Sequence, residues 1–402
     1  MLPPLTFLPS ARQMAVALSG GVDSLVTLYH MRRSVPQGTV IAALYTNHHQ
    51  RAASDLESRV IQGWCQNLGI PFYSLDLDTP MGADAATLRR ARYRAMITWC
   101  HAHHHPVLIT GHHSDDQNET FLIAAQRGSG VDGLAGMRPI HVWWGIQVVR
   151  PLLMVPKDQI VAEARTLGLR WIEDPSNTKM AFLRNRLRSA LLDTPHHLET
   201  TLGALTAARD YFDRNVDTFF RQHVQIFPEG YLTLPYPALV SQDGEIARRI
   251  LKQALRLISG KAVDPRFARL SRATWALYQA PKQTLSLHGC IITSTPEKIL
   301  IYREAKAIDP TPLPADQPHL WDQRFFCQAH EPDAYWAALG AEGYERIRPH
   351  LKATQRPLRY AVALTQPALW SKQDHRVLAA PTLHYEPEER SLRVFFLGWA
   401  VT

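Results

Sequence analysis

Short runs of apolar and β-branched residues alternate with amphipathic stretches along the first 190 residues of the chain. The runs lie at Met14–Leu18, Val40–Thr46, Pro71–Leu77, Val107–Thr110 and Ile146–Val149. The stretches between most of them have helical periodicity and lie at Asp23–Arg33, Asp55–Leu68, Thr87–Cys100 and Asp116–Gln126. Strands that alternate with helices are typical of a parallel sheet. We therefore expect a doubly wound α/β domain over residues 1–195, with its ligand at the carboxyl ends of the strands.

The alternation stops near residue 196. Helices are predicted over residues 199–224, 244–259 and 267–279, and a β-hairpin over Thr284–Tyr302 with its turn near Ser294–Lys298. Residues 309–318 contain four prolines and form the best candidate linker. We therefore predict a mostly helical domain over 196–308 and a small α+β domain over 319–402.

The composition is that of an ordinary globular protein, with 46% apolar and 20% charged residues in 402. No apolar run approaches the ~20 residues of a membrane-spanning helix, and the amino terminus lacks a secretory signal pattern. The four cysteines contain no C-x-x-C pair, so we expect a cytoplasmic protein. The formal charge is +8, and Arg outnumbers Lys 35 to nine, which favours a polyanionic partner such as nucleic acid.

The first predicted strand runs directly into Ser19-Gly20-Gly21-Val22-Asp23-Ser24. Two glycines allow a tight turn, after which the first N–H groups of a helix face an anion, and the two serine hydroxyls add donors. Asp23 would repel bound phosphate unless Mg²⁺ lies between them, which makes Asp23 a candidate metal ligand. In isolation, such a loop is better explained by residues that only cap a helix. Its place after the first strand favours anion binding.

This S-G-G-x-D-S loop resembles that of the PP-loop ATP pyrophosphatases, and it matches neither a Walker A loop nor a G-x-G-x-x-G fingerprint. The resemblance implies a Rossmann-like domain that splits ATP between the α- and β-phosphates and transfers AMP to a substrate oxygen. Residues Ser19–Ser24 would then bind ATP and hold the leaving pyrophosphate. The loop is shared by several branches of that superfamily, so it does not identify the acceptor.

A second motif follows the predicted strand at Val107–Thr110. It reads G-H-H-S-D-D-Q-N-E-T over Gly111–Thr120 and is followed by R-G-S-G-V-D-G-L-A-G-M over Arg127–Met137. Asp116 and Glu119 are three residues apart and share one face of a helix. Two carboxylates at that place can bind an ammonium group, hold a metal or favour the helix amino terminus electrostatically.

Residue by residue, this motif is similar to the signature of the tRNA(Ile)-lysidine synthetase family, H-H-x-x-D-Q-x-E-T followed by R-G-S-G-x-x-G-L-x-G-M. The resemblance spans about residues 14–190. Further matches are Asn47-His48, Arg51, Arg89–Tyr93, Arg150–Leu153, Glu173–Asn177, Phe182, Arg184–Arg186 and Arg188. The family usually has Glu where this chain has Ala85, and an acidic residue is common where it has Lys179.

The resemblance implies ATP-dependent ligation of free L-lysine to C2 of the wobble cytidine in the CAU-anticodon isoleucine tRNA, through an adenylated cytidine. It implies ATP and Mg²⁺ as cofactors, and tRNA and lysine as partners. The implied catalytic residues are Asp23, Asp116 and Arg186, with Asp116 and Glu119 binding lysine. The implied supporting residues are His48, Arg92, His112, His113 and Gln117, and the implied phosphate contacts are Arg184, Arg186 and Arg188.

Three other functions compete with this interpretation. A PP-loop base thiolase needs a catalytic cysteine pair or an iron–sulfur cluster, whereas Cys65 and Cys100 stand alone within predicted helices. An amide-forming synthetase usually has a glutaminase domain or partner, and a non-catalytic nucleotide-binding module has no use for paired carboxylates. The basic helices at Arg248–Arg256 and Pro265–Arg272 are expected to contact tRNA. The sequence does not distinguish a monomer from a dimer.

Overall fold

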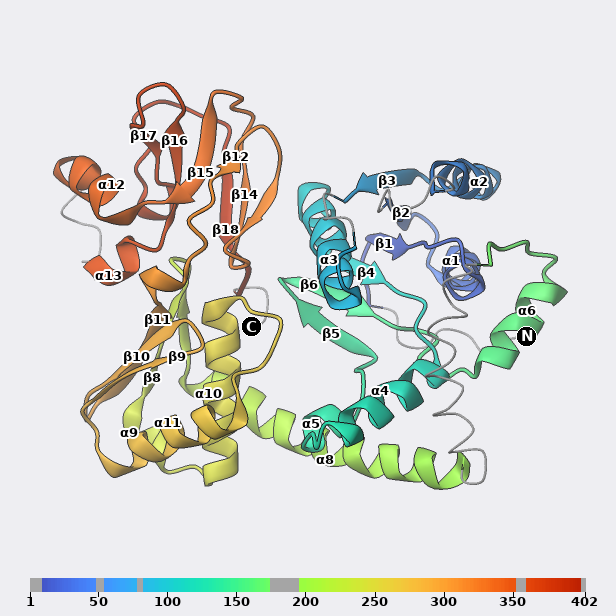
Figure 1. Ribbon diagram of the computed structural model, residues 1–402, viewed down its shortest axis with the longest axis horizontal. Helices are drawn as coiled ribbons and strands as arrows, with labels where there is room; N and C mark the ends of the chain where they lie inside the picture. Colours follow the sequence, from blue (N-terminus) through green and yellow to red (C-terminus); the bar gives the residue numbers. More distant parts are fainter. Residues whose placement is uncertain (1–8, 48–53, 78–81, 174–194, 352–358, 399–402) are drawn as a thin grey trace. The chain divides into compact units, whose positions relative to one another are not determined.

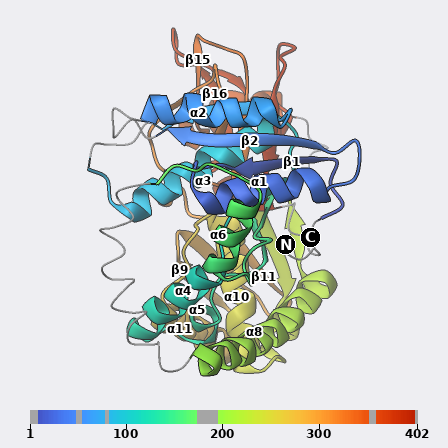
Figure 2. The same ribbon diagram turned by 90° about the vertical axis from the view of Figure 1, so that its right-hand side faces the viewer.

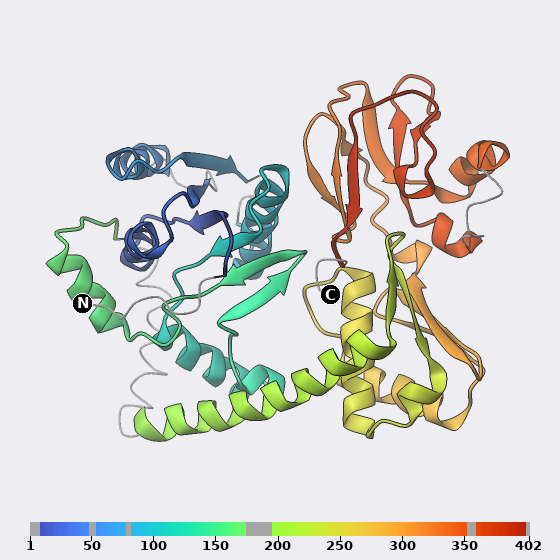
Figure 3. The same ribbon diagram turned by 180° about the vertical axis from the view of Figure 1, so that it is seen from behind.

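The computed structural model describes residues 9–47, 54–77, 82–173, 195–351 and 359–398 of the chain. The chain divides into two compact units, Met1–Tyr211 and Phe212–Thr402 (Figure 1). The boundary lies within one long helix, α8 (Pro195–His223) (Figure 3). Among the described residues, none of the helices is both long and apolar enough to cross a membrane. A cytoplasmic location stays a prediction.

The first unit contains a six-stranded sheet in the order β3-β2-β1-β4-β6-β5. Its first five strands in that order run parallel, and only β5 at the edge is antiparallel. The strands are β1 (Gln13–Ala17), β2 (Val40–Asn47), β3 (Phe72–Asp76), β4 (Val107–Ile109), β5 (Ile140–Trp143) and β6 (Ile146–Val149). The predicted doubly wound sheet is therefore confirmed. Its strand order reverses between β1 and β4, where a crevice for a ligand is expected at the carboxyl ends.

Helices cover both faces of this sheet because side chains alternate along each strand. Met14 and Val16 of β1 belong to an apolar cluster with Leu28 of α1 and Ile61 of α2, whereas Ala15 points to the other face. On that other face, α3 contacts β2, β4 and β6. The helix α6 lies beside α1 (Figure 2). The helices are α1 (Val22–Ser34), α2 (Ser54–Asn67), α3 (Ala85–Ala102), α4 (Ser114–Gln126), α5 (Val131–Leu134) and α6 (Lys157–Thr166).

Three elements of this unit were not predicted from the sequence: β5, the four-residue helix α5, and α6. The strand β5 forms a hairpin with β6 through Trp144 and Gly145, whose φ angles of 46° and 78° give the left-handed turn that matches strand twist. A Trp-Gly turn is an uncommon signal for such a hairpin. The helix α6 buries only Ile160, Glu163 and Ala164, so its apolar periodicity is weak.

After α8, the second unit contains an antiparallel sheet in the order β7-β8-β11-β10-β9. The predicted helices occur in the same part of the chain. The strands are β7 (Gln225–Phe227), β8 (Tyr231–Pro235), β9 (Gln283–Leu287), β10 (Cys290–Ser294) and β11 (Lys298–Arg303). The helices are α9 (Tyr236–Val240), α10 (Gly244–Ser259) and α11 (Phe267–Gln279). The hairpin predicted over Thr284–Tyr302 is wrong in one respect, since it contains a third strand. An additional two-residue turn at His288–Gly289, with φ of 60° and 78°, separates β9 from β10.

Residues beyond 308 form two small antiparallel sheets, β12-β15-β16-β17 and β13-β14-β18. Their strands are β12 (Leu313–Pro314), β13 (His319–Trp321), β14 (Phe325–Gln328), β15 (Ala334–Ala338), β16 (Pro367–Ser371), β17 (Val377–Ala379) and β18 (Arg393–Phe396). Two helices, α12 (Gly340–Ile347) and α13 (Tyr360–Ala363), accompany three 3₁₀ turns at Ala305–Ala307, Arg348–His350 and Pro381–Leu383.

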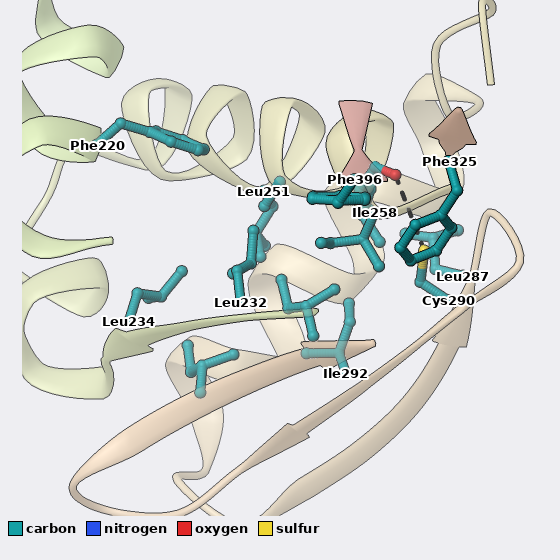
Figure 4. Close-up of a cluster of buried hydrophobic side chains, with 14 of the residues drawn as sticks. Phe220, Leu232, Leu234, Leu251, Ile258, Leu287, Cys290, Ile292, Phe325 and Phe396 are labelled. Carbon is teal, nitrogen blue, oxygen red and sulfur yellow. Dashed lines mark hydrogen bonds between the residues drawn. The ribbon is translucent and has the colours of Figure 1, made fainter. Parts of the chain in front are cut away.

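One apolar core joins these parts of the second unit. Phe220, Leu232 and Leu251 pack in the same buried cluster as Phe325 and Phe396 from beyond the proline-rich segment (Figure 4). Within that segment, Leu313–Pro314 pairs with β15 and Ala315 is buried. The three-domain division with a linker at 309–318 stays a prediction, but these residues of the segment are packed into the unit.

Candidate active site

The loop Ser19–Ser24 connects β1 to α1 at the reversal of strand order. Gly20 has φ of +84°, and a Cβ there would lie 3.0 Å from the side-chain tips of both Ile61 and Ile172. The Ser24 hydroxyl donates to the Gly21 carbonyl at 3.0 Å and accepts from the Ser19 N–H at 3.1 Å. The first N–H groups of α1 have no acceptor within the helix. The loop is thus braced by its own serine hydroxyls, and it presents these N–H groups at the helix amino terminus, where an anion is favoured.

Gly111 brings the end of β4 against this loop. A Cβ at Gly111 would lie 2.9 Å from the carbonyl carbon and oxygen of Asp23 and 3.0 Å from the Ser24 nitrogen. These are backbone atoms, so no rotamer change can relieve the contact. The glycine allows the chain after β4 to pass directly over the first turn of α1.

We expect Gly111→Ala to lower the free energy of unfolding by ~1–3 kcal/mol, because the added methyl group overpacks two backbone segments. A matched control is Gly63→Ala in the interior of α2, where a Cβ meets nothing within 4 Å. That change should raise stability by ~0.5–1 kcal/mol through the better helix propensity of alanine. Urea unfolding of both variants measures the difference. Equal effects of the same sign would contradict the close approach at Gly111.

Three carboxylates surround the ring of His113, and we call Asp23, Asp115 and Asp116 the acidic cluster. His113 Nε2 lies 3.9 Å from Asp23 Oδ1 and 3.6 Å from Asp116 Oδ2, and its Nδ1 lies 3.9 Å from Asp115 Oδ1. His113 is the N-cap of α4, and its backbone N–H donates to Asp116 Oδ2 at 3.1 Å. Asp116 therefore caps the helix with one oxygen, while its side chain is 24% exposed.

Lys157 is a residue of the site that sequence reasoning missed. Its ammonium group donates a hydrogen bond to Asp23 Oδ1, and its backbone N–H lies 3.4 Å from Asp115 Oδ1. Lys157 begins α6, which follows β6, so it reaches the same edge of the sheet as the loop. The rarity of lysine could have singled out this residue, because Lys157 and Lys179 are the only lysines in the first 211 residues.

The acidic cluster matches the chemistry of a hard divalent cation without forming a complete metal site. In the part of the chain that the structure describes, no three His, Cys, Asp or Glu side chains are arranged to hold a metal. Mg²⁺ commonly uses one or two carboxylates together with substrate phosphates. Asp23 beside the anion loop fits that role for an ion that arrives with a nucleotide. Mg²⁺ at Asp23 stays a prediction.

The segment after α4 is held by two side chains rather than by a sheet. The Gln117 amide accepts from the Met137 N–H at 2.6 Å and donates to the Met137 carbonyl at 2.9 Å. The buried Arg209 of α8 donates to the carbonyl oxygens of Ala135 and Gly136 at 3.1 Å and 2.8 Å. The predicted supporting residue Gln117 is therefore engaged in positioning the chain at Met137.

A second group of charged side chains lies around His112, and we call Arg89, Arg92 and Arg150 the cationic cluster. Arg89 stacks over the ring of Tyr93 at 5.2 Å, and Arg150 donates to the Arg138 carbonyl at 2.8 Å. His112 Nδ1 lies 2.9 Å from Thr110 Oγ1. Burial, and then the charges of Arg150, Arg89 and Arg92, lower the pKa of His112 to about 3. His112 is therefore neutral at pH 7.

The structure thus brings most of the predicted residues to one edge of the sheet. Asp23, His113 and Asp116 meet in the acidic cluster, and Glu119 lies one turn further along α4. Arg92 belongs to the cationic cluster, and His112 lies among the arginines of that cluster. The remaining predicted site residues lie outside the described part of the chain: His48, Arg184, Arg186 and Arg188.

Comparison with known proteins shows the family to which the chain belongs. Residues 4–194 match the family model of a PP-loop domain. The chain is 31% identical over 395 residues to a tRNA(Ile)-lysidine synthase of Wolbachia pipientis wMel, covering 93% of this chain and 89% of that protein. It is also 31% identical over 387 residues to a tRNA(Ile)-lysidine synthase of Ruegeria pomeroyi, covering 92% and 88%. The similarity extends through both compact units.

Proposed function

Because the chain belongs to the tRNA(Ile)-lysidine synthase family, we propose that it ligates free L-lysine to the wobble cytidine of the CAU-anticodon isoleucine tRNA. The observation that carries the proposal is the meeting of Asp23 and Asp116 at one histidine ring, 3.9 Å and 3.6 Å away, directly beside an anion loop. An anion loop binds the phosphates of ATP, and a carboxylate next to it can receive an amine. Adenylation and amine transfer need these two groups together.

In the first step, cytosine O2 attacks the α-phosphorus of ATP, and the bond from that phosphorus to the bridging oxygen of pyrophosphate breaks. Such a transfer depends on positioning and charge neutralisation more than on covalent help. The N–H groups at the start of α1 receive the leaving pyrophosphate, and Lys157 neutralises charge beside Asp23. Mg²⁺ bound at Asp23 would supply further charge neutralisation for the phosphates.

In the second step, the ε-amine of lysine attacks C2, and the bond between C2 and O2 breaks as AMP leaves. A lysine ε-amine has an ordinary pKa of ~10.4, so it must lose a proton before it attacks. We assign the acceptance of that proton to Asp116 and the binding of the ammonium form to Asp116 with Glu119. Arg186, outside the described residues, is expected to contact phosphate in the same step.

A PP-loop base thiolase is the main alternative, and the burial of the cysteines argues against it. All four are buried and unpaired. Burial raises the pKa of Cys65 to about 11 and raises that of Cys100 still further from its ordinary value. A thiolate that attacks or carries sulfur needs exposure and a lowered pKa. These cysteines have neither property.

The test is incubation of the full chain with ATP, Mg²⁺, labelled lysine and the CAU-anticodon isoleucine transcript. We expect label in the RNA only when ATP is present, together with release of AMP and pyrophosphate. A matched control is a transcript whose wobble cytidine is replaced by uridine. Pyrophosphate release without labelled RNA, or label in the uridine transcript, would contradict the proposal.

Asp116→Asn separates the two steps, because it removes a base but keeps an oxygen for the His113 N–H. We expect pyrophosphate release to continue while lysine transfer falls by ~100-fold or more, the usual contribution of a positioned base. Transfer at the full rate would exclude Asp116 as the base.

A further inference from the structure

The contact between α1 and α6 contains a buried polar pair that the proposed reaction does not use. His30 Nε2 of α1 lies 3.3 Å from Glu163 Oε1 of α6, and the two residues are only 8% and 5% exposed. Burial lowers the pKa of His30, so the ring is neutral at pH 7. Polar groups buried beside apolar side chains cost free energy unless they are paired. The two helices are therefore favoured in the one arrangement that brings these groups together.

This pair continues a row of apolar contacts between the two helices. Val22 and Val26 precede His30 at steps of four residues, so the three share one face of α1. On α6, Ile160 and Ala164 pack in the same buried cluster as the two valines. The row of contacts therefore runs along α1 from its first turn to the buried pair.

The other end of this row lies at the anion loop, where Lys157 donates a hydrogen bond to the Asp23 carboxylate. Lys157 and Glu163 are six residues apart on α6, and Asp23 and His30 are seven residues apart on α1. At ~1.5 Å per residue, both spacings correspond to about 10 Å along a helix. Two polar contacts at matched spacing fix the register of two helices that run in the same direction. A slide of α6 along α1 would break both contacts.

The two polar contacts differ in how firmly they can hold α6. The side chains of Lys157 and Asp23 are 33% and 27% exposed, and a partly exposed ion pair contributes little to stability. The pair of His30 and Glu163 is instead shielded from water. Glu163 is also one of only three buried residues of α6. The position of α6 therefore depends on the buried pair, and the position of Lys157 follows from it.

We propose that His30 and Glu163 are positioning residues, which hold α6 on α1 so that Lys157 stays beside Asp23 at the anion loop. This inference rests on the proposed function, because its consequence for catalysis is the charge neutralisation that Lys157 supplies in the first step. Neither positioning residue is assigned a contact with ATP, tRNA or lysine. Both act through Lys157, about two helical turns away.

The first test measures the protection of Lys157 directly. The full chain is acetylated briefly with acetic anhydride in the absence of ATP and Mg²⁺, and each lysine is quantified by mass spectrometry. We expect Glu163→Ala to raise the acetylation of Lys157 by about 2- to 5-fold, the range for loss of a partly exposed ion pair. The exposed Lys282 serves as the internal reference. Arg165→Ala, which alters an exposed neighbour on α6, should leave Lys157 protected. Glu163→Gln keeps the length of the side chain and an oxygen for His30, so it should retain most of the protection.

The second test asks whether the pair acts on the reaction through Lys157. Pyrophosphate release in the presence of the CAU-anticodon transcript gives kcat/KM for ATP. Glu163→Ala should lower this value by ~10-fold or more, as expected when a positioned group is displaced. In a Lys157→Met background, Glu163→Ala should cause no further loss, because the two changes remove the same interaction. His30→Ala removes the other member of the pair and should give the same results.

Two outcomes would overturn the inference. One is unchanged acetylation of Lys157 in both Glu163→Ala and His30→Ala. The other is an equal loss of kcat/KM in the presence of Lys157 and in the Lys157→Met background, which would show a purely structural role. Failure of the proposed function is distinguishable, because the acetylation test needs no substrate. If the unaltered chain transfers no lysine to tRNA while Glu163→Ala still exposes Lys157, the positioning role is supported and the proposed function is wrong.

Discussion

Replacing Asp23 with asparagine is expected to lower kcat/KM for ATP by ~100- to 1,000-fold, the usual effect of removing one preorganised charge from a phosphoryl-transfer site. Asp23 is the second residue of α1, and its carboxylate faces both Lys157 and His113. Asparagine keeps the shape of the side chain but can neither pair with Lys157 nor bind a divalent cation well. Pyrophosphate release in the presence of tRNA measures the loss, and the Mg²⁺ concentration for half-maximal rate should rise.

The fold should tolerate this change. Asp23 is 27% exposed, and a carboxylate in the first turn of a helix contributes only ~0.3–1 kcal/mol through the helix dipole. The matched control is Asp158→Asn, which alters an exposed carboxylate in the first turn of α6, next to Lys157 in sequence. Asp158→Asn should keep the rate within about twofold. If both variants lose activity equally, or if Asp23→Asn retains it, the assigned role of Asp23 is wrong.

The second large effect is expected at Asp322, where one carboxylate serves two buried arginines. Arg303 Nη2 donates to Asp322 Oδ1 at 2.8 Å, and Arg324 Nε donates to Asp322 Oδ2 at 2.6 Å. The three side chains are at most 5% exposed. Among the described residues, Asp322 is the carboxylate that pairs with both arginines, so Asp322→Asn removes that charge and leaves two guanidinium groups in the protein interior. We expect the second unit to lose ~3–5 kcal/mol of stability.

Asparagine isolates the charge effect at this position. Asp322 has φ of 46°, and asparagine tolerates the left-handed region as well as aspartate does. The control is Glu345→Gln, which breaks an exposed pair with Arg348 at 3.7 Å and should cost less than ~1 kcal/mol. Thermal unfolding of the full chain measures both. A loss below 1 kcal/mol for Asp322→Asn would mean that the network is balanced by other groups.

In the helix predicted over 244–259, the pattern of charged residues does not show which arginines are exposed. Its basic segment Arg248–Arg256 is expected to contact tRNA. In the structure Arg249 is buried, paired with Glu245 at 2.7 Å and stacked 4.2 Å from the ring of Phe212. An arginine can bury its long stem while its charge is paired, and periodicity alone does not detect this. Arg249 is therefore buried rather than available for that contact.

The sequence by itself determined the elements that depend on neighbours along the chain. The apolar runs predicted the parallel strands, the glycines at positions 20 and 21 predicted the turn after β1, and the spacing of Asp116 and Glu119 placed both on α4. These features are local, because strand alternation, glycine φ angles and helix periodicity are properties of adjacent residues.

Only the tertiary structure decided which distant residues meet. Lys157 reaches Asp23 across 134 residues, and Arg209 holds Ala135 across 74. The acidic cluster and Lys157 meet because β4 lies between β1 and β6, which brings three strand ends to one edge. Spacing along a chain does not encode strand order, since order follows from how all the helices and strands pack together. The partners of these charged groups were therefore fixed by the folded sheet.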